Sequence, residues 1–266
     1  MVILLSVRIE EAKTITMAFT VFPDETLEDL QLNGLKILQK KEAFRFGVDA
    51  VLLSHFVRVK KKQRVLDMGT GTGILPILLA AKTEAAWITG LEIQPEIAAM
   101  AKRSIDGNGL ENRVEIISGD IKRVTSLLGA ATYDVVVTNP PYTRAGGGLK
   151  NPEESKAIAR HELFCTLEDV LRSGAQMLKP QGEFYMVHRP NRLTDILEGM
   201  RKMKIEPKLL QMVCPREGEA PSLILVKGIR NGKPGLKILP QLLIYDKEGR
   251  YTKETRLIYS ENEGIK

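Results

Sequence analysis

The stretch Val65-Leu66-Asp67-Met68-Gly69-Thr70-Gly71-Thr72-Gly73 decides the fold class of this chain. An apolar run followed by closely spaced glycines and then an amphipathic segment is typical of a strand that turns directly into a helix. A dinucleotide-binding loop has a similar turn, so the glycines alone leave that alternative open. Here, however, the spacing is Gly-x-Gly-x-Gly behind Asp67, and no Gly-Lys-Ser/Thr follows to form a phosphate loop.

The alternation of strand and helix continues on both sides of this turn. We predict strands over 64–67, 86–92, 114–117, 133–138, 183–188, 208–213 and 222–227, and helices over 73–82, 95–108, 157 or 167 to 178, and 193–202. This pattern predicts an α/β, doubly wound sheet with both faces covered, whose last two strands form a hairpin. We expect an N-terminal extension (1–43), this domain (44–228) and a basic C-terminal tail (229–266), with one strand-like run interrupted by Pro240.

Composition narrows the class of protein. The two cysteines among the 266 residues lie in no CxxC spacing, so we expect neither a disulfide framework nor a metal site, and a reducing, cytoplasmic location. The apolar run at residues 1–5 is too short for a signal peptide, and Met17 is an alternative start. The net charge of +6 favours an anionic partner, with Lys60, Lys61 and Lys62 as one concentration of charge, although such a run is also typical of a solvated surface.

Acidic residues follow three of the predicted strands. Asp67, Glu92 and Asp120 lie where the carboxyl ends of parallel strands meet at one edge of the sheet. Asp67 can attract a cationic group, Glu92 can accept both hydroxyls of a ribose, and Asp120 can accept an adenine amine. Ile93 and Ile121 follow two of these acids and can sandwich the ring. Each acid alone is more typical of a helix N-cap or a surface carboxylate, but the repetition at three strand ends favours one shared site.

Asn139-Pro140-Pro141-Tyr142 directly follows the predicted strand 133–138. Two consecutive prolines cannot continue a sheet ladder, so the strand must end in a rigid turn. The amide oxygen of Asn139 and the carbonyl of Pro140 can accept the two N–H bonds of an exocyclic NH₂, while Tyr142 can stack on the base that carries it. The alternative is an ordinary surface loop, since Asn and Pro are common turn residues.

Together these motifs resemble those of the class I S-adenosylmethionine-dependent methyltransferases, over residues 44–227. The resemblance implies S-adenosylmethionine as cofactor, seven strands with the last antiparallel, and direct in-line methyl transfer to an amide or exocyclic nitrogen. It implies that Asp67 and the glycine loop hold the methionine portion. The implied catalytic residues are Asn139, Pro140, Pro141 and Tyr142, and the implied cofactor-binding residues are Phe46, Asp49, Asp67, Gly69, Thr70, Gly71, Gly73, Glu92, Ile93, Asp120, Ile121 and Asn139.

Further segments resemble the bacterial valine-tRNA adenine-N6 methyltransferases: 25–30, 39–40, 44–50 and 159–162. This resemblance implies a tRNA adenine beside the anticodon as the methyl acceptor. It places Phe46 and Asp49 at the cofactor pocket, although Phe46 is equally typical of a core residue. Arg160 and His161 are predicted to line the substrate entrance, or to be a charge cluster at a helix start. Lys60 to Lys62 are predicted to contact RNA phosphates.

Three rival functions share parts of these patterns. Protein-glutamine methyltransferases that act on release factors carry the same turn but usually a longer helical N-terminal domain, and here only about 40 residues precede the cofactor-pocket segment. Ribosomal RNA guanine-N2 methyltransferases have a chemically similar turn. A binding protein that keeps the fold without catalysis is the non-enzymatic rival.

Overall fold

The computed structural model describes residues 19–42, 47–140 and 165–260. Its main sheet has the strand order β10-β8-β9-β7-β6-β3-β4-β5, in which β10 is the short strand Lys237–Ile238, and a second short strand, β11 (Leu242–Leu243), also pairs with β8. The long strands are β3 (Arg64–Met68), β4 (Trp87–Glu92), β5 (Val114–Ser118), β6 (Tyr133–Thr138), β7 (Leu178–His188), β8 (Ile205–Cys214) and β9 (Leu223–Arg230). Strand β9 is antiparallel to β7 and β8, and the other long strands are parallel to one another. The seven predicted strands are all present and the last of them is antiparallel, as predicted, but two short strands outside the predicted seven, β10 and β11, extend the sheet to nine strands.

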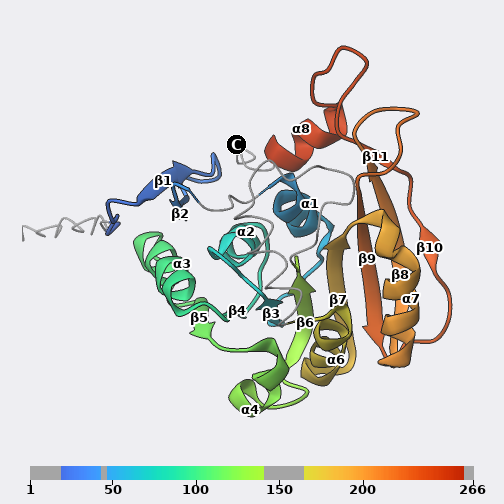
Figure 1. Cartoon of the computed structure of the whole chain (residues 1–266), viewed down its shortest axis with the longest axis horizontal. Helices are drawn as coiled ribbons and strands as arrows, with labels where there is room; N and C mark the ends of the chain where they lie inside the picture. The colour runs from blue at the N-terminus through green and yellow to red at the C-terminus, as the bar shows by residue number, and fades with distance from the viewer. Residues whose placement is uncertain (1–18, 43–46, 141–164, 261–266) are drawn as a thin grey trace, which may run out of the picture.

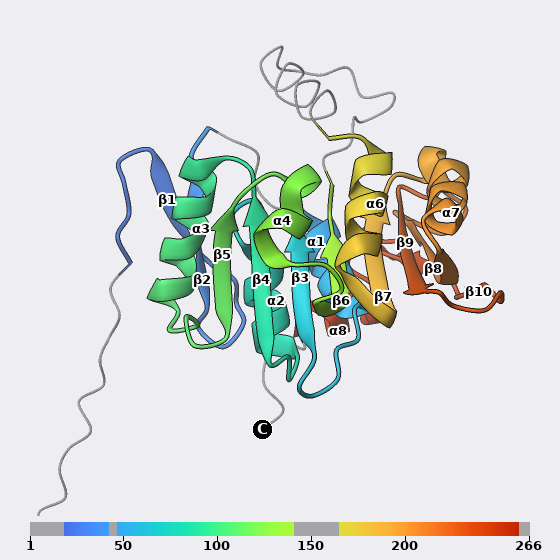
Figure 2. The ribbon, with the colours of Figure 1, turned by 90° about the horizontal axis from the view of Figure 1, so that it is seen from below.

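Helices cover both faces of this sheet (Figures 1 and 2). The helices are α1 (Val48–Phe56), α2 (Ile74–Lys82), α3 (Pro95–Gly107), α4 (Val124–Leu128), α6 (Leu167–Met177), α7 (Leu193–Lys202) and α8 (Lys253–Ser260), with short 3₁₀ turns η1 (Ile121–Arg123) and η2 (Pro190–Arg192). The packing of these helices on the sheet forms two clusters of buried apolar side chains. Helices α1, α2 and α8 contribute to the first cluster, and α6 and α7 contribute to the second. In β6, Val135 and Val137 enter the first cluster and Val136 the second, which explains the continuous apolar run of this strand.

Two predicted strands begin later than the observed ones. Strand β7 begins at Leu178, because the predicted turn around Pro180 is an irregularity within one strand, with Gln181 at φ 64°. Strand β8 begins at Ile205, and its register against β9 shifts between Pro207 and Leu209. Proline cannot donate a ladder hydrogen bond, so a bulge absorbs it where a strand boundary was predicted.

The N-terminal segment forms a hairpin that the sequence pattern did not reveal. Strands β1 (Glu25–Asp29) and β2 (Lys36–Lys40) pair antiparallel, separately from the main sheet. Arg103 of α3 donates to both carboxylate oxygens of Glu25, at 2.8 and 2.6 Å, and the Leu38 N–H donates to Ser104 Oγ at 3.0 Å. The hairpin is therefore fastened to the helix that follows β4.

The predicted C-terminal tail packs against the main sheet. Strands β10 (Lys237–Ile238) and β11 (Leu242–Leu243) both pair parallel with β8, and Pro240 separates them as predicted. Helix α8 lies on α1, with Ile258 buried in the same apolar cluster. The domain boundary after residue 228 stays a prediction. Within the described ranges, no helix is long and apolar enough to cross a membrane.

The hairpin contact predicts a pH-dependent stability. The hydrogen bonds from Arg103 hold the pKa of Glu25 below its usual value of 4.5, so this contribution is present above pH 4.5 and is lost as the pH falls through the lower, folded-state pKa. We expect Glu25→Gln to lower the free energy of unfolding by about 1–3 kcal/mol at neutral pH. Denaturant unfolding should show the difference shrinking in acid.

A matched control is Glu84→Gln, because the pair of Glu84 with Lys61 spans 3.8 Å and both side chains are 73% exposed. Such a pair contributes little, so this variant should unfold like the wild type. A Glu25→Gln deficit that is as large in acid as at neutral pH would contradict the role of the ion pair.

Candidate functional site

Asp67 is fully buried near the carboxyl end of β3, and neither of its carboxylate oxygens has a hydrogen-bond partner among the residues that the structure describes. Burial raises the pKa of Asp67 to about 7. The nearby Thr70 hydroxyl lowers this pKa in part, although it forms no hydrogen bond with the carboxylate, and the charge of Glu92 raises the pKa further. A buried, unpartnered carboxylate is costly, so its presence marks a candidate ligand site.

The glycine loop uses backbone conformations that side chains disfavour. Gly69, Gly71 and Gly73 have φ of 77°, 55° and 85°. A Cβ on Gly73 would lie 3.2 Å from the Cβ of Ala101, so glycine lets α2 begin close to α3. None of the described residues lies within 4 Å of a Cβ built on Gly71, so they leave this side of the loop open. The loop can therefore admit a ligand against its backbone.

Glu92 ties the glycine loop to the end of β4. Glu92 is 5% exposed, and one of its carboxylate oxygens accepts the Gly71 N–H at 2.9 Å, while the other accepts the backbone N–H of Gln94 at 3.0 Å and its side-chain amide at 3.4 Å. The oxygen that is bonded to Gly71 keeps acceptor capacity, so the carboxylate can still receive a hydroxyl group of a ligand. The arrangement fits the ribose role that was predicted for Glu92.

The residues predicted for the adenine lie at the neighbouring strand ends. Asp120 follows β5 and caps η1 by accepting the Lys122 N–H at 2.9 Å, which is the helix-cap arrangement left open by the sequence. Ile121 lies beside the glycine loop, with its Cδ1 3.9 Å from the Cβ position on Gly69. Ile93, after β4, is 44% exposed. The structure thus places all three next to the carboxyl ends of β4 and β5, and their contact with adenine stays a prediction.

Asn139 and Pro140 directly follow β6, which pairs with β3. The Thr138 hydroxyl donates to the Met68 carbonyl at 2.9 Å and fixes the two strand ends together. Asn139 is half-buried and Pro140 is buried, at the same sheet edge as Asp67. Thr138 was not predicted as a site residue. Its only signal in the sequence is a hydroxyl at the end of a valine run. Pro141 and Tyr142 lie outside the described residues.

Asp49 lies in the first turn of α1, where its carboxylate is 9% exposed and accepts the Ala50 N–H at 3.0 Å. The C-terminal end of α1 leads through residues 57–63 to the start of β3, and it lines one cavity together with the C-terminal end of α2. This end of α1 therefore lies at the amino end of the sheet, and the end bearing Asp49 points toward the carboxyl edge. This position agrees with the predicted cofactor role, which stays a prediction. Phe46, Arg160 and His161 lie outside the described residues.

Lys60, Lys61 and Lys62 lie between α1 and β3, at the edge opposite the glycine loop. The structure therefore does not bring them together with Asp67 and Asn139, and their contact with RNA stays a prediction.

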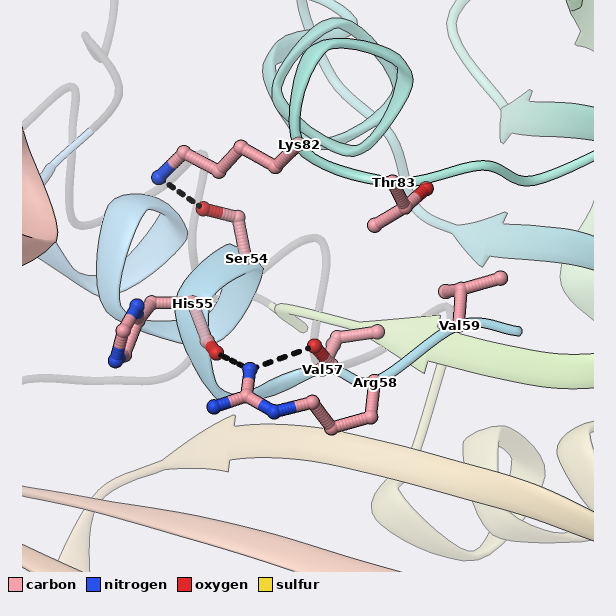
Figure 3. A pocket seen from close by; sticks show the side chains of 7 residues that line it. All are labelled: Ser54, His55, Val57, Arg58, Val59, Lys82 and Thr83. Carbon is pink, nitrogen blue, oxygen red and sulfur yellow. Dashed lines mark hydrogen bonds between the residues drawn. The ribbon is translucent and has the colours of Figure 1, made fainter. Parts of the chain in front are cut away.

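A cavity of about 120 Å³ lies at the C-terminal ends of α1 and α2. It is lined by Ser54, His55, Val57, Arg58, Val59, Lys82 and Thr83 (Figure 3). The Arg58 guanidinium donates to the carbonyls of His55 and Val57, across the end of α1 (Figure 3). In the described part of the chain, no group of three or more His, Cys, Asp or Glu could hold a metal ion.

Comparison with known protein families shows which family the chain belongs to. The family model of the methyltransferase small domain matches residues 46–203, more than half of the chain. The chain belongs to this methyltransferase family. The methyltransferase is 27% identical over 231 residues to a tRNA1(Val) (adenine(37)-N6)-methyltransferase of Bacteroides fragilis, covering 86% of this chain and 96% of the relative. It is 33% identical over 160 residues to the protein of the same name from Porphyromonas gingivalis, covering 58% and 62%.

A solved structure supports the same fold. The crystal structure of a predicted O-methyltransferase, protein Atu636 from Agrobacterium tumefaciens, matches with a TM-score of 0.66 at 23% identity, covering 80% of this chain and 96% of that one. The methyltransferase uses S-adenosylmethionine, and its site fits this cofactor. The unpartnered carboxylate of Asp67 suits a cationic group, and the side of the loop that the described residues leave open at Gly71 gives the cofactor room against the backbone.

The Asp67 carboxylate predicts a loss of cofactor affinity on substitution. We expect Asp67→Ala to weaken S-adenosylmethionine binding by about 10-fold or more, the scale of a lost charged interaction. Isothermal titration calorimetry measures this directly. Asp195→Ala is the matched control, because Asp195 is exposed and pairs with Arg192 away from the loop. Equal affinities of the Asp67 variant and the wild type would remove Asp67 from the cofactor site.

The pKa of about 7 for Asp67 predicts how unliganded stability varies with pH. Unfolded Asp67 releases its proton near pH 3.8, whereas the folded protein keeps it until about pH 7. The folded state therefore binds more protons in this window, and the free energy of unfolding falls as the pH rises, by about 4 kcal/mol in total. Asp67→Asn should lack this slope in urea unfolding series, and parallel curves for the two proteins would contradict the assignment.

Proposed function

We propose that this methyltransferase transfers the methyl group to the exocyclic N6 of an adenine in tRNA, next to the anticodon. The observation that carries the proposal is the position of Asn139 and Pro140 at the end of β6, beside the strand that bears Asp67. An acceptor turn and the predicted donor site therefore share one edge of the sheet. The relatives named above, which bear the name of a tRNA adenine-N6 methyltransferase, support the choice of adenine.

The acceptor turn offers hydrogen-bond acceptors for an NH₂ group. The amide oxygen of Asn139 and the carbonyl of Pro140 would each accept one N–H, which orients the nitrogen and raises its electron density. S-adenosylmethionine supplies the electrophilic methyl group when it is bound. Alignment of reacting groups can account for about 7–11 kcal/mol of a barrier, so positioning by rigid strand ends is the main contribution that we assign to this chain.

A covalent route through cysteine is disfavoured. Burial raises the pKa of Cys165 to about 11, with the Asp169 carboxylate adding to the shift, and burial also raises the pKa of Cys214. Both side chains are therefore thiols at neutral pH, and the thiolate is the nucleophilic form. This supports direct transfer to the nitrogen.

An RNA substrate agrees with the charge of the chain and with the chemistry of the turn. The net charge of +6 favours a polyanion. Bases of a tRNA loop are unpaired, so one can leave the stack at lower cost than a base in a duplex. We place the enzyme in the cytoplasm, as the sequence predicts.

The substrate class can be tested by incubating the enzyme with labelled S-adenosylmethionine and, separately, total tRNA, ribosomal RNA and release factor. The proposal expects label in tRNA, recovered as N6-methyladenosine. Label only in release factor would support the protein-glutamine alternative, and label only in ribosomal RNA, as N2-methylguanosine, would support the guanine alternative. Either result would overturn the proposal.

Substitution of Asn139 separates binding from transfer. We expect Asn139→Ala to keep cofactor affinity but to lower the turnover number by about 100-fold or more, the scale found when a hydrogen bond that positions reacting groups is removed. Single-turnover methylation of tRNA measures the chemical step.

Asn139→Asp is the conservative variant, because it keeps an oxygen acceptor and should lose less activity than Asn139→Ala. Asn112→Ala, at an exposed turn, is the control. Unchanged turnover in Asn139→Ala would refute the acceptor role.

A further inference from the structure

The outer edge of the sheet carries four lysines that the proposed transfer reaction does not use. We call Lys204, Lys208, Lys233 and Lys237 the lysine edge. Strand β10 lies beside β8, on the side of the sheet away from α3 (Figure 1).

Backbone and side-chain contacts hold the segments that carry these lysines together. The Lys208 ammonium donates to the Lys233 carbonyl at 3.2 Å, and the Lys204 carbonyl accepts the Asn231 N–H at 2.7 Å. Lys237 of β10 is in register with Leu209 of β8, the residue after Lys208. Segments from β8 and from the chain around β10 therefore form one surface.

The charge of the lysine edge is uncompensated. Within the described ranges, none of its lysines takes part in an ion pair, and Lys204, Lys233 and Lys237 are exposed. The nearby acid, Glu206, is paired with Arg201 at 3.2 Å. The sequence has no acidic residue from 220 to 245. A hollow of about 280 Å³ opens beside the lysines, lined by Lys204, Glu206, Asn231 and Gly232. The surface is therefore suited to a polyanion.

We propose that the lysine edge binds the phosphate backbone of a base-paired stem of the RNA substrate; this inference rests on the proposed function. Strand β8 is 10 residues long and runs parallel to β6. Its amino end therefore lies about 30 Å from the carboxyl edge of the sheet, at roughly 3.3 Å per residue. Lys237 is opposite Leu209, five residues or about 17 Å from the carboxyl end of β8, so the lysine edge extends from there to the amino end of the strand. A stem that leaves a loop base at Asn139 would cross the ends of β7 and β9 and then run back along β8 to these lysines. Phosphate contacts of this kind position an RNA without reading its sequence.

An alternative role for these lysines is protection of a sheet edge. Strand β10 is a short edge strand in which Ile238 is 66% exposed, and lysines on an edge discourage pairing with other chains. The two roles differ in what substitution changes. Loss of RNA contacts weakens binding in a salt-dependent way, whereas loss of edge protection promotes self-association without altering the affinity for RNA.

The test uses the full chain with Lys233→Gln and Lys237→Gln combined. Its affinity for substrate tRNA is measured over a salt series, beside the wild type. We expect binding about 10-fold weaker at 0.1 M salt and a log–log salt slope that is shallower by about 2, one for each lost phosphate contact. Cofactor affinity should be unchanged. A single-stranded loop oligonucleotide, which cannot reach the lysine edge, should bind the variant and the wild type equally.

Lys41→Gln with Lys102→Gln is the matched control, because it removes the same charge from exposed positions after β2 and on α3, on the other side of the domain (Figure 1), and should leave the slope as in the wild type. Equal slopes for the lysine-edge variant and a wild type that methylates tRNA would overturn this inference and leave the proposed function standing. Self-association at unchanged affinity would overturn it in favour of edge protection. A wild type that methylates only protein would overturn the proposed function and this inference together.

Discussion

The burial of the Asp67 carboxylate, with no hydrogen-bond partner among the residues that the structure describes, is the constraint on which the candidate site depends. Strand β3 lies between β4 and β6 with apolar layers on both faces, so the carboxylate near its end is removed from water. The unliganded fold carries this cost, which a cationic ligand can offset. The Glu92 carboxylate holds the glycine loop at Gly71, next to the acid, so the loop and the buried charge form one preorganised unit.

The parallel pairing of β3 with β6 brings this unit to the same end of the sheet as the Asn139 turn. The bond from Thr138 to the Met68 carbonyl joins the end of the donor strand to the strand that leads into Asn139. In the proposed function, a nitrogen held at Asn139 would therefore be placed relative to the cofactor by two paired strands. Rigid elements of this kind suit a reaction whose rate depends on alignment.

Much of this arrangement is predictable from the sequence, because the strands of a buried parallel sheet are continuous apolar runs and their ends carry the polar residues. The β1–β2 hairpin was missed, since four of the five residues of Glu25–Asp29 are polar and the hairpin is held by Arg103, 78 residues from Glu25. Strands β10 and β11 have two residues each, so β8 and not local pattern specifies them. Helix α8 owes its position to the burial of Ile258 against α1, which no local signal reveals.

The central claim is that the Asn139 turn presents the NH₂ of a tRNA adenine to the methyl donor. Mass spectrometry of tRNA nucleosides from a strain that lacks this gene tests it most directly. The account predicts that N6-methyladenosine is lost from the tRNA, and that it returns with the wild-type gene but not with the Asn139→Ala gene. An unchanged level of N6-methyladenosine in the deletion strain would contradict the account.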